Sequence, residues 1–148
     1  GVDGGEKVSR KEIAESVGVT SVSNYQFCHF MRMKDHYSAL VDAAEREWNS
    51  MIDTYSVPYY PHVSVGWDAN PRYNVHHENV CHGNTPELVE DAFRRARNFV
   101  DAHMDKLKAP LITVNSWNEW TETSYLLPDN VNGYGYLEAI KKVFVDEE

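Results

Sequence analysis

Two glutamates, Glu119 and Glu122, stand three residues apart in a polar stretch that follows an apolar run beginning after Pro110. A segment that is apolar over the length of a strand and then abruptly polar typically delivers side chains to a site at the strand's carboxyl end. Carboxylates at this spacing point to opposite faces of an extended strand, but they converge if the backbone turns after it. Convergent carboxylates suit sugar chemistry, in which one acid protonates a leaving oxygen and a second group supplies or relays the nucleophile.

Aromatic side chains flank the glutamates at Trp117, Trp120 and Tyr125. Their faces are suited to holding the C–H faces of a pyranose. The same residues also permit a plain structural interpretation, because exposed glutamates are common and tryptophans often cap a hydrophobic core. Residue types alone therefore leave a sugar site and an ordinary surface loop both open.

The stretch from Trp117 to Asp129 reads Trp-Asn-Glu-Trp-Thr-Glu-Thr-Ser-Tyr-Leu-Leu-Pro-Asp. It resembles the signature of glycoside hydrolase family 99 and its WbsX-like relatives, roughly Trp-Asn-Glu-Trp-(His/Thr)-Glu-Gly followed by an apolar pair and an acidic-proline element. The resemblance implies that Glu122 is the general acid/base and that Glu119 contacts the sugar 2-hydroxyl, on a retaining route through a 1,2-anhydro sugar. It implies no cofactor. Such chemistry needs one ionised and one protonated carboxylate near neutral pH.

A second element, Gly66–Tyr73, reads Gly-Trp-Asp-Ala-Asn-Pro-Arg-Tyr and is similar to a Gly-Trp-Asp-x-x-Pro-Arg element of the same relatives. In a binding role, Trp67 would stack on sugar, while Asp68 and Arg72 would bind hydroxyls or brace one another. In a structural role, the element is a rigid loop in which Asp68 and Arg72 pair. Asn118, between the first tryptophan and the first glutamate, is expected to orient the substrate or a carboxylate.

Three positions depart from the hydrolase signature. Thr123 stands in place of the glycine, Leu127 in place of an acid before proline, and Thr121 in place of the histidine typical of endo-mannosidases. Threonine at position 121 is closer to the polysaccharide-biosynthesis relatives. These changes alter the loop and one polar contact, so a preference for mannose does not carry over, whereas both carboxylates are retained.

Helices and strands are expected to alternate along the chain. A capping box at Ser9–Glu12 opens a short helix that Gly18 ends. The predicted strands are 19–27, 59–65 and 111–117, and the longer helices are 35–55, 85–107 and 137–144. This order is typical of parallel βα units with crossover connections.

The predicted fold class is α/β, with 1–148 forming a single domain. A (β/α)₈ barrel usually takes roughly 250 residues, so three βα units are well under half of one. The family resemblance implies that the chain is the carboxyl-terminal portion of such a TIM barrel. Because a portion of this kind exposes strand edges, we expect it to require self-association or the remainder of the barrel.

The composition limits the partners. The net charge is −9, from 14 basic and 23 acidic residues, which argues against nucleic acid and suits a neutral or weakly basic substrate. No apolar run approaches the roughly 20 residues of a membrane-spanning helix. Cys28 and Cys81 are too few for a disulfide scaffold, although a single bridge stays open. The stretch His76–His82 contains zinc-ligating residue types without their usual spacing, so we expect no metal site.

These observations favour a carbohydrate-active enzyme, a retaining glycoside hydrolase acting on an oligosaccharide or polysaccharide. Two alternatives stay open: a polysaccharide-biosynthesis glycosyltransferase-like protein, and a non-catalytic carbohydrate-binding domain.

Overall fold

The computed structural model describes residues 10–146, so the capping role predicted for Ser9 lies outside them. The α-helices are α1 (Arg10–Ser16), α2 (Tyr37–Met51), α3 (Pro86–Ala102) and α4 (Gly135–Phe144). The strands are β1 (Val22–Ser23), β2 (Tyr59–Tyr60), β3 (His62–Ser64), β4 (Thr113–Asn115), β5 (Asn118–Glu119) and β6 (Ser124–Tyr125). Three short 3₁₀ turns are η1 (Phe27–His29), η2 (Asn70–Arg72) and η3 (Trp120–Glu122).

Strands β1 to β4 pair in parallel and are connected by crossover helices. β1 pairs with β2, and β3 pairs with β4, with Ser64 opposite Asn115. β2 and β3 follow one another on either side of Pro61, so this one segment has β1 along its first half and β4 along its second. α2 connects β1 to β2, and α3 connects β3 to β4. The predicted mixed α/β fold with parallel βα units is confirmed at this level.

The predicted strands are longer than those observed, because backbone groups near their ends form hydrogen bonds with side chains or with other loops and not with a neighbouring parallel strand. The strand expected over 19–27 covers two residues. Phe27 lies in η1, where its amide donates to the Gln26 side chain and to Ser64 Oγ in place of a ladder bond. The strand expected over 111–117 covers three residues, since the Trp117 carbonyl instead accepts hydrogen bonds from the amides of Leu126 and Leu127.

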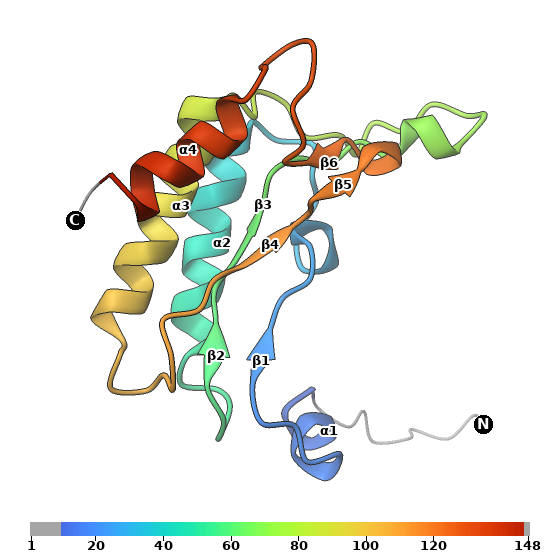
Figure 1. Ribbon diagram of the computed structural model, residues 1–148. Coiled ribbons are helices and arrows are strands. Elements are labelled where there is room, and N and C mark those ends of the chain that lie inside the picture. The colour runs from blue at the N-terminus through green and yellow to red at the C-terminus, as the bar shows by residue number, and fades with distance from the viewer. Residues whose placement is uncertain (1–9, 147–148) are drawn as a thin grey trace, which may run out of the picture.

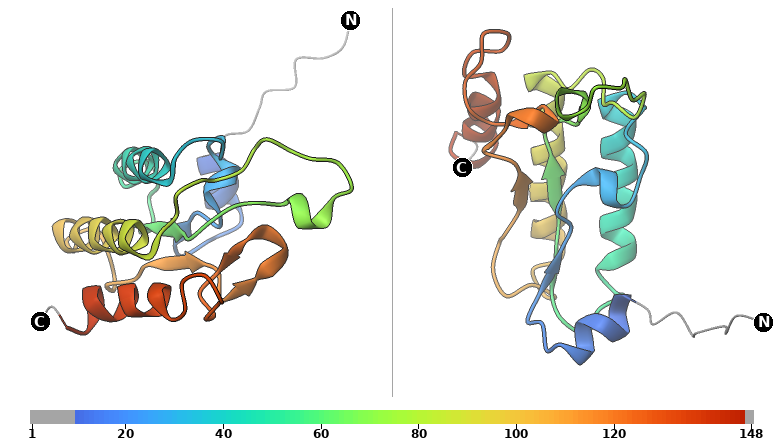
Figure 2. Two further views of the ribbon diagram at one scale, coloured as in Figure 1. Left: turned by 90° about the horizontal axis from the view of Figure 1, so that it is seen from above. Right: turned by 90° about the vertical axis from the view of Figure 1, so that its right-hand side faces the viewer.

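Three helices, α2, α3 and α4, lie along one side of the parallel strands, with α3 between the other two (Figures 1 and 2). The apolar face of α2 is buried as its periodicity predicts, and Trp48 meets Phe99 of α3 with ring centroids 5.9 Å apart. α3 also buries Val89 and Phe93, which lie at steps of three and four from Ala92, Ala96 and Val100 and so belong to the same apolar face.

The loops that follow β1, β3 and β4 gather at the same end of the sheet, away from α1 (Figure 1). Among residues 10–146, no helix is long and apolar enough to cross a membrane. Cys28 and Cys81 are both free thiols, so the bridge that the sequence left open is not formed.

Candidate functional site

Glu119 and Glu122 are brought together by a tight hairpin at the carboxyl end of β4. β5 and β6 pair antiparallel, with Glu119 opposite Ser124, and η3 forms the turn between them. Ser116 holds the hairpin closed: its hydroxyl donates to the Ser124 carbonyl at 2.7 Å and accepts from the Glu119 amide at 3.2 Å. The backbone therefore turns after the strand, which is the condition under which two carboxylates at this spacing converge.

One guanidinium, that of Arg72, contacts both carboxylates. Its Nη1 is 2.6 Å from Glu122 Oε1, and its Nη2 is 2.9 Å from Glu119 Oε1. Its Nε donates to Thr121 Oγ1 at 2.7 Å, and the Thr121 hydroxyl donates in turn to Glu119 Oε1 at 2.8 Å. We call these four residues the acidic centre. A planar fork of donors suits this arrangement, since it can meet two carboxylates at once.

The loop carrying Arg72 is locked against the hairpin by a close backbone approach. A Cβ at Gly66 would lie 2.4 Å from the Thr123 carbonyl oxygen, so only glycine fits. Two residues on, the Asp68 amide donates to the Glu122 carbonyl at 2.7 Å. The Asp68 carboxylate accepts from the Asn70 amide at 2.8 Å, which fixes the start of η2. Asp68 therefore shapes the loop, and the Asp68–Arg72 pair offered by one structural interpretation is not formed.

The two glutamates have different surroundings. The pKa of Glu119 is lowered, chiefly because the Thr121 hydroxyl hydrogen bonds its carboxylate and also because Arg72 pairs with it, against an opposing effect of desolvation. The Glu119 side chain is 38% exposed, whereas that of Glu122 is 12% exposed. Glu119 is thus an accessible carboxylate held in its ionised form, and Glu122 is the more enclosed of the pair.

Aromatic rings stand beside the acidic centre with unequal exposure. Trp117 and Trp120 are 55% and 46% exposed, and Trp120 packs against Tyr125 with ring centroids 4.1 Å apart and ring planes tilted by 31°. Trp67 is partly buried and packs against the hydrophobic core, so it differs from these two exposed indoles. Asn118 is exposed in β5, opposite Tyr125. The hairpin therefore presents most of the predicted sugar platform, and the earlier loop contributes Arg72.

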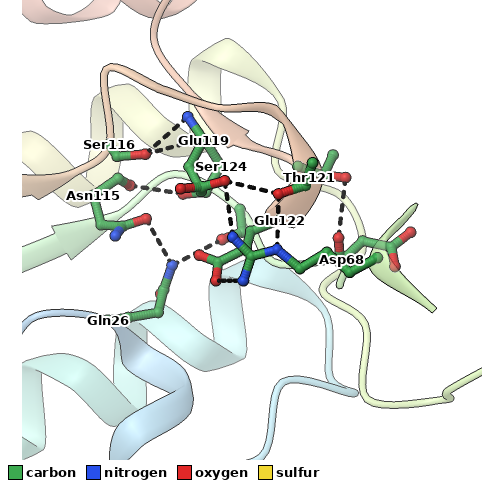
Figure 3. Close-up of polar contacts among 11 residues, drawn as sticks. Gln26, Asp68, Asn115, Ser116, Glu119, Thr121, Glu122 and Ser124 are labelled. Carbon is green, nitrogen blue, oxygen red and sulfur yellow. Dashed lines mark hydrogen bonds and ion pairs between the residues drawn. The ribbon is translucent and has the colours of Figure 1, made fainter. Parts of the chain in front are cut away.

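Buried polar side chains beneath the acidic centre join all three loops, and no motif or pattern in the sequence marks the main one, Gln26. The Gln26 amide donates to Asn115 Oδ1 at 2.9 Å and to the Gly66 carbonyl at 3.4 Å (Figure 3). The Asn115 carbonyl accepts from Ser124 Oγ at 2.8 Å. Gln26 and Asn115 are 1% and 2% exposed. Such contacts fix the relative positions of the loops after β1, β3 and β4, because buried polar groups need partners.

A histidine lies deeper in the same polar layer. The two ring nitrogens of His62 are 2.9 Å from Thr113 Oγ1 and 3.0 Å from Ser64 Oγ. Burial, and to a smaller extent the charge of His29, lowers the pKa of His62 to about 4. His62 is therefore neutral near pH 7 and serves the packing of the strands.

Metal-ligating side chains do not cluster in the part of the chain that the structure describes: no three or more of them are grouped closely enough to hold an ion. Within His76–His82, the His77 amide and carbonyl both bind the Asn70 side chain, and the Cys81 amide donates to the Trp67 carbonyl. This segment is fixed to the Arg72 loop by its backbone.

Comparison with known proteins identifies the family. The family model described as Glycosyltransferase WbsX matches residues 4–140. Two curated relatives, both named uncharacterized protein WxcX, come from Xanthomonas campestris pv. campestris strains B100 and ATCC 33913, and each is 31% identical over 87 residues. That alignment covers 56% of this chain and 12% of each relative, so the chain matches only a small part of their length. No solved structure matches the chain.

Proposed function

The chain belongs to the WbsX glycosyltransferase family, and from this premise we propose that its acidic centre performs retaining glycoside hydrolysis on an oligosaccharide or polysaccharide. Glu122 is the general acid/base and Glu119 engages the sugar 2-hydroxyl. The observation that carries the proposal is the placement of both carboxylates within 3 Å of one guanidinium. Exposed indoles beside this centre add the apolar faces on which a pyranose stacks.

The proposed reaction divides the proton transfers between the two glutamates. Glu119 takes the proton of the 2-hydroxyl while that oxygen attacks the anomeric carbon and the glycosidic bond breaks. Glu122 gives its proton to the departing oxygen. Water then opens the 1,2-anhydro ring at the anomeric carbon, Glu122 takes a proton from this water, and Glu119 returns a proton to the 2-oxygen. The lowered pKa of Glu119 keeps it ionised, as its role as a base requires.

Arg72 adds a condition to this route. Its Nη1 occupies Glu122 Oε1 at 2.6 Å, whereas in the first step the Glu122 carboxyl group must face the leaving oxygen. We therefore propose that the leaving-group oxygen replaces Arg72 as the partner of Glu122 when substrate binds. Arg72 keeps its contact with Glu119 throughout.

A glycosyltransferase-like role is the second candidate, and the description of the family favours it. The same two carboxylates would then act on a sugar donor, and a saccharide hydroxyl would take the place of water. A non-catalytic carbohydrate-binding domain would use the indoles and no proton transfer.

We also propose that this segment is the carboxyl-terminal portion of a (β/α)₈ barrel. Ser23 Oγ of β1 and Thr113 Oγ1 of β4 lie 2.7 Å apart although the β2–β3 segment runs between their strands. Contact between side chains of alternate strands indicates a strongly curved sheet, and inward residues of alternate strands share layers in TIM barrels. A hollow of about 320 Å³ beside β4, lined by Leu111, Ile112 and Ile140 among others, offers apolar surface for the rest of the barrel.

The test is turnover of a panel of α-linked oligosaccharides by the full-length protein, with the rest of the proposed barrel present. The anomeric configuration of the product is followed by proton NMR. Retained configuration, with turnover reduced about 10²–10⁴-fold by Glu122→Gln, supports the hydrolase. Glu138→Gln is the matched control, since Glu138 is an exposed carboxylate on α4. Transfer to a second saccharide without hydrolysis supports the transferase. Binding without turnover, unchanged by Glu122→Gln, removes the catalytic assignment.

A further inference from the structure

A second hollow, of about 420 Å³, lies between the loop after β1 and the loop that follows η2. It is lined by Cys28, Met31, Arg32, Lys34, Glu78 and Asn79. The two loops are joined at its wall, where the Met33 amide donates to Asn79 Oδ1 at 2.8 Å. Its volume is within the range of small-ligand sites, roughly 300–1,000 Å³. We call it the basic hollow.

The basic hollow adjoins the acidic centre. Next to Cys28 in the chain, the Phe27 amide donates to Ser64 Oγ at 3.0 Å, and the Gln26 side chain reaches the Gly66 carbonyl. These contacts hold the start of the loop over the end of β3, from which the Arg72 loop departs. The pKa of the Cys28 thiol is raised to about 11, mainly by burial and secondly by the negative charge of Glu122. Glu122 is thus close enough to a wall of the hollow to act on it electrostatically.

The two cations of the basic hollow differ from the cation of the acidic centre. Arg72 is neutralised by Glu119 and Glu122. Arg32 and Lys34 are exposed, and neither forms an ion pair within residues 10–146. Against them the hollow has one carboxylate, Glu78, so its lining has a net positive charge in a chain whose net charge is −9.

We propose that the basic hollow binds an anionic group, a carboxylate or a phosphate, carried by the saccharide that occupies the acidic centre. This inference rests on the proposed function, because it places a sugar at Glu119 and Glu122. Arg32 and Lys34 supply the charge, and the Asn79 side chain supplies a polar wall. A carboxylate is the anion of a uronic acid within a polysaccharide, and a phosphate is the anion of a nucleotide-linked sugar donor. The overall negative charge suggested a neutral or weakly basic substrate, but the local charge next to the centre points to an acidic one.

The experiment compares saccharides that differ only in the anion. The probes are disaccharides ending in glucuronic acid, their glucose counterparts with the same linkage, and uridine diphosphate glucose. Affinities for the full chain are measured by calorimetry at low and high salt. The test variant is Arg32→Gln/Lys34→Gln. Its matched control is Arg46→Gln/Lys108→Gln, which removes the same two charges from exposed positions on α2 and in the loop before β4.

We expect the charged probe to bind about tenfold more tightly than its neutral counterpart at low salt, as two partly exposed charge pairs provide. The test variant removes this preference and the control keeps it. Preference for the glucuronide supports the uronic acid source, and preference for the nucleotide sugar supports the phosphate source. Equal affinity for charged and neutral probes, unchanged in the test variant, overturns the basic hollow and leaves the proposed function standing. Absence of binding by every saccharide overturns both.

Discussion

Replacing Arg72 by glutamine is the most direct perturbation of the acidic centre. The guanidinium makes three side-chain contacts at 2.6, 2.7 and 2.9 Å, and they join two loops that are about 50 residues apart in the chain. Without it, Glu119 and Glu122 lose their common partner and like charges face each other. A displacement of about 1 Å at a reacting group costs on the order of 10²-fold in rate. We therefore expect kcat/KM to fall about 100-fold in Arg72→Gln.

The pH profile separates this positioning role from a general loss of structure. Thr121 and Arg72 together lower the pKa of Glu119, so removal of Arg72 raises it. The acidic limb of kcat/KM, where ionised Glu119 is lost, then moves to higher pH. Arg72→Lys keeps the charge but offers one ammonium in place of a fork, and it should restore part of the rate. Arg46→Gln is the control. Full activity in Arg72→Gln, or an acidic limb that does not move, would refute the reasoning.

Two further predictions concern stability. Because burial lowers the pKa of His62 to about 4 from 6.5, the unfolded chain takes up its proton first; the contribution of neutral His62 is complete above pH 6.5 and is lost as the pH falls toward 4. Between pH 6.5 and 5, the unfolding free energy of the unsubstituted protein should fall by about 1.5 kcal/mol more than that of His62→Gln, as measured by urea titrations at each pH. An equal fall in the two proteins would contradict this. Thr123 has a left-handed backbone with φ 51°, which is costly for a β-branched residue. Thr123→Gly should raise the unfolding free energy by about 0.5–1 kcal/mol; a decrease would mean that the 3.3 Å contact of its hydroxyl with the Asp68 carbonyl outweighs the strain.

Local patterns predicted the helices better than the strands. The buried face of α2 follows from residues recurring at steps of three and four, a property of the segment alone. The first predicted strand ends early because a side chain from elsewhere in the fold binds its backbone. The Phe27 amide donates a hydrogen bond to Ser64 Oγ, 37 residues further along the chain. A local pattern of β-branched residues contains no information about hydrogen-bond partners elsewhere in the fold. The strands predicted over 19–27 and 111–117 are therefore longer than the observed ones.

The residues of the acidic centre were predictable from the sequence, but the contacts of Arg72 with the two glutamates were not. The glutamates and indoles stand out because they are close in sequence. The sequence predicts that Arg72 binds the substrate or pairs with Asp68 in the same short element. In the folded chain, Arg72 instead contacts Glu119 and Glu122, which lie 47 and 50 residues further along the sequence. Position 123 shows the reverse case: the family signature has glycine there, and the left-handed backbone of Thr123 gives the physical reason.

The charges of the two adjoining sites bear on which substrate can use the acidic centre. Arg72 offsets one of its two carboxylates, so the centre keeps a net negative charge, and the basic hollow beside it keeps a net positive one. Departure of Arg72 from Glu122, which the proposed reaction requires, frees that carboxyl group for the leaving oxygen. An acidic saccharide would place its anion at Arg32 and Lys34 while its scissile bond lies at Glu119 and Glu122. A neutral saccharide would leave the two cations of the basic hollow without a partner.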